Sequence, residues 1–281
     1  MRSLFALVPL LAFAAFAAAQ ETYDLRGPGP KKGQVIVSTS TLKMKDSDLE
    51  LSVMAQKIKL RQTMIVLTEE EEEILEVKGR DVVKTKANII KELTKTSMGE
   101  DEAEEKTGEL EGETIITERA KDGTWKHKLA DAKATEEQEK ELKKRNGPEN
   151  EDEIYPEGKV AVGHTWKVDA AKMKSLTGST FTDVKGKMDQ RFVKVEKVKG
   201  EECAVIETSG TMTGKLKDDD GTPDVELKIT STSWRSLKSG LELKGSFKGT
   251  IKIEGKTKIN DEDVDMKLTG PIEGTSAAKL K

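Results

Sequence analysis

The chain has 281 residues, of which 36% are charged and only 4% are aromatic, and its net charge at pH 7 is −4. So few large apolar side chains exclude a thick globular core and favour one or two domains built on a thin sheet. The single cysteine, Cys203, excludes an internal disulfide and is expected to be an unreactive strand residue. The lack of a dense basic patch with interleaved aromatic residues argues against nucleic acid as a partner.

The chain begins with the features of a secretory signal peptide. Arg2 supplies a positive charge, residues 4–16 are apolar apart from Pro9, and the alanines at 17–19 are the small residues that signal peptidase recognises. We therefore expect residues 1–19 to be a signal peptide, cleaved after Ala19, and the protein to be exported to the periplasm or the exterior. A membrane anchor is disfavoured because the run is shorter than the roughly 20 residues of a span. No later segment is apolar enough to span, so a soluble protein is predicted.

Residues 20–148 are predicted to form an N-terminal antiparallel β region. The dipeptide Asp122-Gly123, between candidate strands at 113–120 and 124–129, is a strong hairpin signal. Residues 58–67 fit a helix as well as a strand. The further strand candidates follow from runs of apolar and β-branched residues: 35–44, 49–53, 58–67, 74–77 and 82–93.

Two acidic blocks interrupt this region. The first is the run Glu69–Glu73, and the second lies within residues 99–108, which contain five acids and no large apolar residue. Such blocks are typical of solvated loops and strand ends, so residues 99–108 are predicted to be a mobile loop. Residues 20–158 are net acidic, whereas residues 159–281 are net basic with alternating charges.

Two short helices are predicted. Thr135 and Gln138 have the spacing of a capping box, and Asn146-Gly147-Pro148 would end that helix. Asp169 would cap a second helix, which Gly178 would stop. The second helix would place three apolar side chains on the sheet: Ala170, Met173 and Leu176.

Residues 149–281 are predicted to form a C-terminal β-meander. In residues 241–259 the odd positions are apolar, glycine or threonine, and the even positions are polar or charged. This alternation over about 50 Å or more favours one bent strand whose glycines permit curvature, although a turn could also break it. Other strands are expected at 204–216, 225–229, 181–198 with a bulge near Phe192-Val193, and 264–268 before Gly270-Pro271.

The predicted fold class is therefore mainly β. We expect a strongly curved antiparallel sheet, a half-barrel or an open barrel, with two short helices. The region 149–281 would continue the sheet of residues 20–148 as one curved sheet.

No pattern for catalysis, metal binding or cofactor binding is present. The two histidines, His127 and His164, have no partners at zinc-ligand spacing, and there is no Gly-x-Ser-x-Gly motif. The segment 218–224 does not fit a calcium loop, because the position of the first ligand is Leu216. We therefore expect a protein without cofactor or enzymatic activity. A hydrolase that uses carboxylates is motivated only by the abundance of acids.

The candidate ligand cleft lies on the apolar face of the curved sheet. Trp166 would either plug one end of the sheet or form the floor of a cleft, with Phe247, Ile251 and Met212 as further lining residues. The preferred hypothesis is a non-catalytic binding module for an apolar small molecule or a lipidated partner. The alternative is a structural or interaction protein of the cell envelope that works through its charged faces. The sequence leaves the oligomeric state open.

The segment from Pro156 to Trp166 reads Pro-Glu-Gly-Lys-Val-Ala-Val-Gly-His-Thr-Trp. With the upstream hairpin from Leu110 to Trp125 and the downstream strands, it resembles an exported bacterial protein family of unknown function, found in planctomycete-type genomes. The resemblance covers residues 70–270. It implies a curved antiparallel sheet similar to the half-barrels of periplasmic lipoprotein carriers, and it implies no catalytic residues.

Overall fold

The structure is a computed structural model, and it describes residues 20–53, 56–148, 150–173, 181–217, 221–259 and 262–281. The predicted signal peptide lies outside these residues. The first half contains β1 (Thr22–Asp24), β2 (Val35–Val53), β3 (Gln56–Lys78), β4 (Asp81–Met98), β5 (Glu104–Thr107), β6 (Thr114–Arg119), β7 (Trp125–Leu129) and α1 (Glu136–Lys144). The second half contains η1 (Glu151–Ile154), β8 (Lys159–Ala161), β9 (Thr165–Asp169), η2 (Ala170–Lys172), β10 (Phe181–Val198), β11 (Glu201–Leu216), β12 (Asp224–Ser236), β13 (Glu242–Ile259) and β14 (Glu262–Leu280), where η marks a 3-10 helix.

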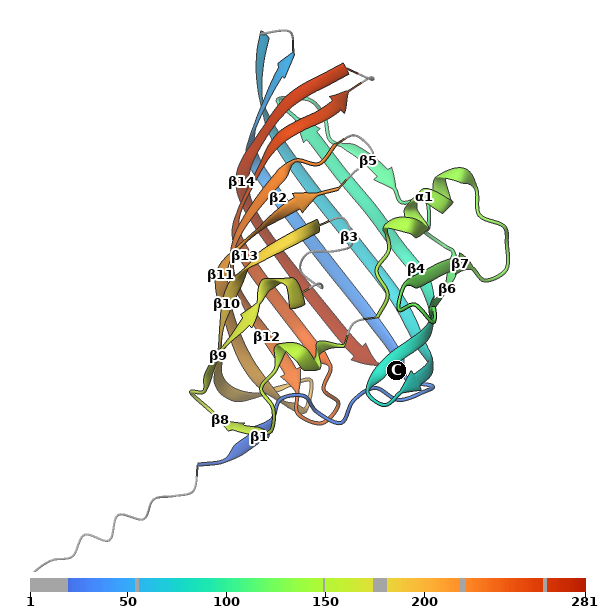
Figure 1. The fold of residues 1–281 in the computed structure, drawn as a ribbon, viewed down its shortest axis with the longest axis vertical. Coiled ribbons are helices and arrows are strands. Elements are labelled where there is room, and N and C mark those ends of the chain that lie inside the picture. Colours follow the sequence, from blue (N-terminus) through green and yellow to red (C-terminus); the bar gives the residue numbers. More distant parts are fainter. Residues whose placement is uncertain (1–19, 54–55, 149, 174–180, 218–220, 260–261) are drawn as a thin grey trace, which may run out of the picture.

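One antiparallel sheet of 12 strands dominates the fold. Its order is β7-β6-β4-β3-β2-β14-β13-β12-β11-β10-β9, and β5 pairs with β4 beside β6. The last strand, β14, pairs with β2, so strands from both halves of the chain belong to the same sheet. The sheet curves but does not close, because β7 and β9 are its end strands (Figure 1). The predicted mainly β fold with an open, half-barrel sheet is confirmed.

The strands of the first half are longer than predicted. Strand β2 joins two predicted strands through a bulge at Asp46, which has φ of 48°. Strand β3 runs through residues 58–78 without a break, so the helical alternative for 58–67 is wrong. The placement of Glu69–Glu73 in a loop or strand end is also wrong, because this run lies in the middle of β3. Cations next to the run favour this position, since Glu69 and Glu73 pair with Lys91 and Lys86 across the strands and Lys281 contacts Glu71.

The predicted loop at 99–108 and the predicted end of the last strand also need correction. Residues 104–107 form β5, which is exposed, and Glu105 makes an ion pair with Lys95 of β4. Strand β14 does not end before Gly270-Pro271 but continues to Leu280. Pro271 is tolerated because the register with β2 shifts between Thr269 and Ile272. A bulge of this kind removes the need for the N–H that proline lacks.

The predicted capping box of α1 is present. The Gln138 backbone N–H donates to Thr135 Oγ1 at 3.2 Å, and the Thr135 N–H donates to the Gln138 side chain at 3.0 Å. Among the described residues, the second predicted helix is the short η2, because Met173 leaves the helical region with φ −97° and ψ 54°. Ala170 and Met173 nevertheless pack on the sheet as predicted. Leu176 and Gly178 lie outside the described residues.

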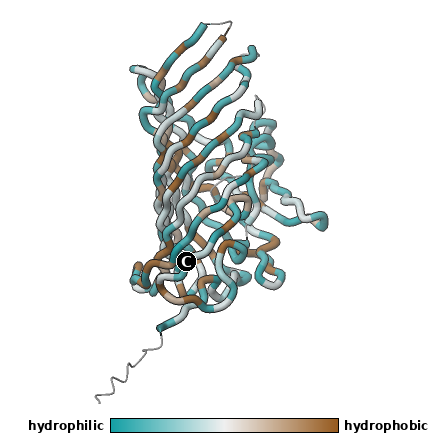
Figure 2. The backbone as a smooth tube through the Cα atoms, turned by 60° about the vertical axis from the view of Figure 1, so that its left-hand side comes forward, coloured by the Kyte–Doolittle hydropathy of each residue, from teal (hydrophilic) through white to brown (hydrophobic). Residues whose placement is uncertain are grey.

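The two faces of the sheet differ in polarity, as the alternation along β13 predicts. Leu243, Phe247, Ile251 and Ile253 face one side and are buried or half-buried, whereas the lysines between them are exposed. Figure 2 shows the resulting alternation of hydrophobic and hydrophilic residues along neighbouring strands. We call the side that carries Phe247 the inner face, because η2 and α1 pack against it, and the other side the outer face.

One end of the half-barrel is closed. The short β1–β8 ribbon lies below the sheet in Figure 1, next to a second core cluster formed by Leu25, Tyr155, Val160, Phe192, Ala204 and Ile206. We call this region the closed end. Within the described ranges, no helix combines the length and apolar composition needed to cross a membrane.

Candidate ligand-binding face of the half-barrel

The strand register brings the four predicted cleft residues to the inner face. Phe247 pairs with Ser231, and the same cross-strand row continues through Thr208 and Gln190 to Trp166. Ile251 pairs with Leu227, which pairs with Met212 on the next strand. Directly paired residues of antiparallel strands point to the same face of a sheet. All four side chains therefore belong to one surface, although they come from β9, β11 and β13.

The four residues differ in how accessible they are. Met212 is 0% exposed and belongs to the core cluster, so it supports the face from within the core. Phe247 and Ile251 are half-buried and pack against that cluster. Trp166 is also half-buried and contacts both core clusters, while its Nε1 donates to Ile154 O at 2.9 Å. Trp166 thus lies between the closed end and the rest of the inner face.

Around Phe247 the inner face leaves a continuous group of apolar side chains partly accessible. We call it the apolar zone, and it consists of Leu51, Leu60, Met64, Phe247, Ile251, Ile253 and Met266. These residues come from four neighbouring strands, β3-β2-β14-β13, and each is only half-buried. Beyond them Ile58, which pairs with Leu51, is 46% exposed. Accessible apolar area of this extent is typical of surfaces that bind apolar molecules.

A polar row borders the apolar zone towards the closed end. It crosses six neighbouring strands through residues that pair directly: Ser233, Gly245, Ser276, Ser40, Thr68 and Glu92. The hydroxyls of Ser40 and Thr68 lie 2.7 Å apart. The Glu242 carboxylate accepts a hydrogen bond from Ser276 at 3.2 Å, and a Cβ on Gly245 would overlap both groups. Because Gly245 has no side chain, the Glu242 carboxylate can occupy the space beside it.

A carboxylate cluster lies at the β3–β4 side of the polar row. We use this name for Glu70, Glu72 and Glu92, whose register places them on the inner face. Arg145, just after α1, contacts Glu70 Oε2 through Nη2 at 2.5 Å. Burial raises the pKa of Glu72, and a hydrogen bond from Thr85 and the positive charge of Arg145 offset this only in part. Burial also raises the pKa of Glu92, against the positive charge of Arg145 and a hydrogen bond from the Leu110 backbone. The Arg145 guanidinium therefore contacts Glu70, and its positive charge also acts on Glu72 and Glu92.

Sequence reasoning missed the carboxylate cluster, although a signal for it was present. In a strand, residues two apart share a face, so a run of five glutamates must divide between the faces. Glu70 and Glu72 face inwards, opposite Ile89 and Ala87. The run would have indicated an internal acidic site if it had been assigned to a strand. Arg145 gave no comparable signal, because its position depends on how α1 packs.

The histidines do not form a shared site. His127 Nδ1 lies 3.0 Å from Thr117 Oγ1 on the neighbouring strand, and burial, followed by Arg145, lowers the pKa of His127. His164 instead stacks on Trp166, with ring centroids 5.8 Å apart. In the part of the chain that the structure describes, no group of three or more His, Cys, Asp or Glu side chains is arranged to hold a metal ion. Cys203 is buried in β11, and burial raises the pKa of its thiol.

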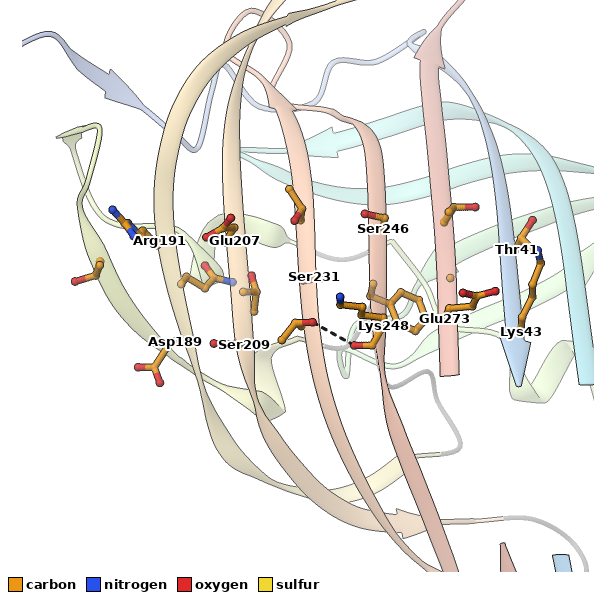
Figure 3. A pocket seen from close by; sticks show the side chains of 18 residues that line it. Thr41, Lys43, Asp189, Arg191, Glu207, Ser209, Ser231, Ser246, Lys248 and Glu273 are labelled. Carbon is orange, nitrogen blue, oxygen red and sulfur yellow. Dashed lines mark hydrogen bonds between the residues drawn. The ribbon is translucent and has the colours of Figure 1, made fainter. Parts of the chain in front are cut away.

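The outer face carries a second candidate site. A groove of about 1080 Å³ crosses β9–β14 and β2, and its lining is mainly hydroxyl and charged side chains (Figure 3). Among the described residues, its cations Lys43, Arg191 and Lys248 have no acidic partner within salt-bridge distance. Asp189, by contrast, pairs with Lys167 at 2.8 Å. This groove suits polar or charged partners rather than apolar ones.

No family model matches the sequence, and no curated protein matches it. Among solved structures, a structure of lipid–protein interactions in lipovitellin is similar with 11% identity and a TM-score of 0.39, and the chain spans only 25% of that protein's length while 89% of the chain is covered. An outer membrane channel from Pseudomonas putida has 9% identity and a TM-score of 0.30, with 90% of the chain and 97% of the channel covered. A DUF1329 family protein from Desulfovibrio piger has 8% identity and a TM-score of 0.16, with 89% and 85% covered. With all three TM-scores below 0.5, these likenesses establish no shared function.

Proposed function

We propose that this protein is an exported, non-catalytic binding module that holds an apolar ligand, or the lipid of a lipidated partner, on its inner face. It would belong to the exported family that the segment 156–166 resembles, and residues 1–19 would be its signal peptide. The observation that carries the proposal is the apolar zone, whose seven side chains lie on the inner face of an open sheet and remain half-buried.

The physical reason is the free-energy cost of exposing the apolar zone to water. Each square ångström of apolar surface removed from water contributes about 25 cal/mol, so a bound acyl chain would stabilise the complex through burial alone. The strands β3, β2, β14 and β13 are neighbours in the sheet, so one ligand lying across them can contact side chains of all four. The half-barrel therefore provides an accessible apolar surface without a closed barrel.

The direct test combines lipid extraction with a matched pair of variants. Purified protein is extracted and its lipids are identified by mass spectrometry, and binding of a fluorescent fatty-chain probe is then titrated. Ile251→Asp places a charge on the inner face, whereas Thr250→Asp places the same charge on the exposed outer face one residue away. We expect Ile251→Asp to weaken probe binding by about tenfold or more, because a buried unpaired carboxylate opposes an apolar ligand.

The control variant Thr250→Asp should bind the probe as the wild type does, with an unchanged β-type circular dichroism spectrum. If no lipid co-purifies and the probe binds neither wild type nor variants, the proposal is wrong. If both variants weaken binding equally, the probe is not on the inner face.

A second candidate is a structural or interaction protein of the cell envelope, supported by the outer groove with Lys43, Arg191 and Lys248. It predicts association with envelope material that decreases at high salt, since exposed charges are screened. Replacing both Lys43 and Lys248 by Gln should abolish that association and leave probe binding intact. Salt-independent, monomeric behaviour with envelope fractions would contradict this candidate.

A further inference from the structure

We infer that the outer face carries a further binding site, in which lysines hold the phosphate monoester of a sugar. We call this site the lysine pocket. It is a cavity of about 630 Å³ on β12, β13, β14 and β2, and four lysines line it: Lys43, Lys45, Lys228 and Lys248. The sugar would lie in the adjoining outer groove. Because this site is on the opposite side of the sheet from the apolar zone, it does not depend on the proposed apolar ligand.

The strand register brings the four lysines together. Lys248 pairs with Glu273, and Glu273 pairs with Lys43, so these side chains point to one face from three neighbouring strands. Lys228 lies on β12, two residues before the partner of Lys248. Lys45 lies two residues after Lys43 on β2. Residues two apart on a strand share a face and are separated by about 6.6 Å, so all four amino groups can reach one small anion.

The lysine pocket has an excess of positive charge. Glu273 is the one acid among its described lining residues, and its Oε1 lies 3.8 Å from Lys45 Nζ. In the part of the chain that the structure describes, the amino groups of Lys43, Lys228 and Lys248 have no acid within salt-bridge distance. Like charges this close repel one another, and a bound anion would offset that repulsion. The lining therefore favours an anion that carries more than one negative charge.

A neighbouring cavity shows that such an excess is not general on the outer face. This cavity of about 830 Å³ is lined by three lysines and four acids: Asp183, Lys185, Lys215, Asp224, Glu226, Lys252 and Glu254. Lys215 contacts Asp224 at 3.6 Å, and Lys252 contacts Glu254 at 2.7 Å. The charges of this cavity are therefore compensated within the chain, whereas those of the lysine pocket are not.

The surroundings of the lysines indicate what carries the phosphate. Lys43 and Lys248 line both the lysine pocket and the outer groove, so the two cavities are continuous. The cross-strand row next to these lysines consists of four hydroxyl side chains that pair directly: Thr232, Ser246, Thr275 and Thr41. Hydroxyls can both donate to and accept from the hydroxyls of a sugar, and ammonium groups make charge-assisted hydrogen bonds to phosphate. A sugar phosphate has both groups side by side.

The experiment is isothermal titration calorimetry at low ionic strength with glucose 6-phosphate, glucose 6-sulfate, glucose and inorganic phosphate. At about pH 7.5 the phosphate monoester carries nearly two negative charges, whereas the sulfate ester carries one. We expect glucose 6-phosphate to bind about tenfold tighter than glucose 6-sulfate, and glucose to bind most weakly. Inorganic phosphate should bind more weakly than glucose 6-phosphate, because it does not reach the hydroxyl row. The exposed double variant Lys228→Gln/Lys248→Gln should weaken the binding of glucose 6-phosphate by about tenfold or more.

The matched control is Lys215→Gln/Lys252→Gln, which removes the same charge from the compensated cavity on the same face. It should bind glucose 6-phosphate as the wild type does. Equal affinity for the phosphate and sulfate esters, or an equal loss in the two double variants, would overturn the phosphate site. Binding to phosphatidylcholine vesicles that contain phosphatidic acid, without binding of glucose 6-phosphate, would overturn the sugar as the carrier. Both double variants should keep the binding of the fatty-chain probe, so failure of this site is distinguishable from failure of the proposed function.

Discussion

Arg235 joins three separate segments at the closed end of the half-barrel. Its side chain is 5% exposed, and its Nε donates to Leu25 O at 2.6 Å while Nη2 donates to Arg26 O at 3.2 Å. Nη1 contacts Glu151 Oε2 at 2.5 Å, and the guanidinium lies 4.1 Å from the centroid of the Tyr155 ring. The residues before β2 and those of η1 are thus held on β12 by one side chain. We predict that Arg235→Leu strongly destabilises the protein.

The expected magnitude follows from the contacts that are lost. Breaking a buried ion pair by removing one partner costs about 3–5 kcal/mol. The Glu151 side chain is 41% exposed and can regain water, so the lower end of this range applies to the pair. Two backbone carbonyls lose a charged donor, and the cation–π contact contributes about 1 kcal/mol more. With about 3 kcal/mol for the ion pair and about 1 kcal/mol for the cation–π contact, we expect the free energy of unfolding to fall by at least about 4 kcal/mol.

The assay is urea denaturation followed by circular dichroism. Arg235→Leu should lower the midpoint without changing the slope of the free energy against urea. Lys167→Met is the control, since Lys167 and Asp189 form an exposed pair and its loss should cost less than about 1 kcal/mol. A loss below about 1 kcal/mol for Arg235→Leu would refute the view that this side chain fastens the closed end.

Three further predictions concern stability. Burial, followed by the charge of Glu151, raises the pKa of Glu242 to about 7 from an ordinary 4.5. The contribution of the neutral Glu242 carboxyl to folding stability is therefore complete below pH 4.5 and is lost as the pH rises through about 7. Denaturation at pH 5 and pH 8 should show a wild-type loss of up to about 3 kcal/mol that Glu242→Gln removes, and equal pH dependence of both proteins would contradict this. Gly270→Ala should cost about 1–3 kcal/mol in the same assay, because the added Cβ would overlap Ser47, and an unchanged midpoint would show that the bulge can relax. Thr135→Ala should cost about 1 kcal/mol by removing the α1 cap, with Thr135→Ser as the control that retains it.

The sequence was most informative where one face is buried and the other is exposed. In β13 the odd positions from Leu243 to Ile253 turned inwards as the alternation predicts, and the bulge after Phe192 was visible as a change of phase. The capping box at Thr135 was also readable, because its hydrogen bonds are local. These features depend on neighbouring residues in the sequence and need no knowledge of the partner strands.

The strands of the first half could not be delimited in the same way. In β3, both Met64 and Ile65, and both Val66 and Leu67, are half-buried on opposite faces, so no alternation marks the strand. The acidic run in β3 is stabilised there by cations from three other segments: Glu69 and Glu73 pair with Lys91 and Lys86 of β4, Arg145 contacts Glu70, and Lys281, just after β14, contacts Glu71 at 2.9 Å. Such pairing depends on strand order. The carboxylate cluster was missed for the same reason, since its members come together only across β3 and β4.

The two ends of the half-barrel differ in burial, and under the proposed function this makes stability and binding separable. At the closed end, Leu25 and Phe192 are almost fully buried and Arg235 ties the surrounding segments together. At the other end, Ile58 and the apolar zone remain accessible around the β2–β3 and β13–β14 strand pairs. A ligand that enters from this side need not open the closed end. Arg235→Leu should therefore lower the unfolding free energy while the remaining folded protein binds the probe with wild-type affinity, whereas Ile251→Asp should weaken binding with a smaller loss of stability. Loss of affinity in folded Arg235→Leu protein would show instead that the closed end takes part in binding.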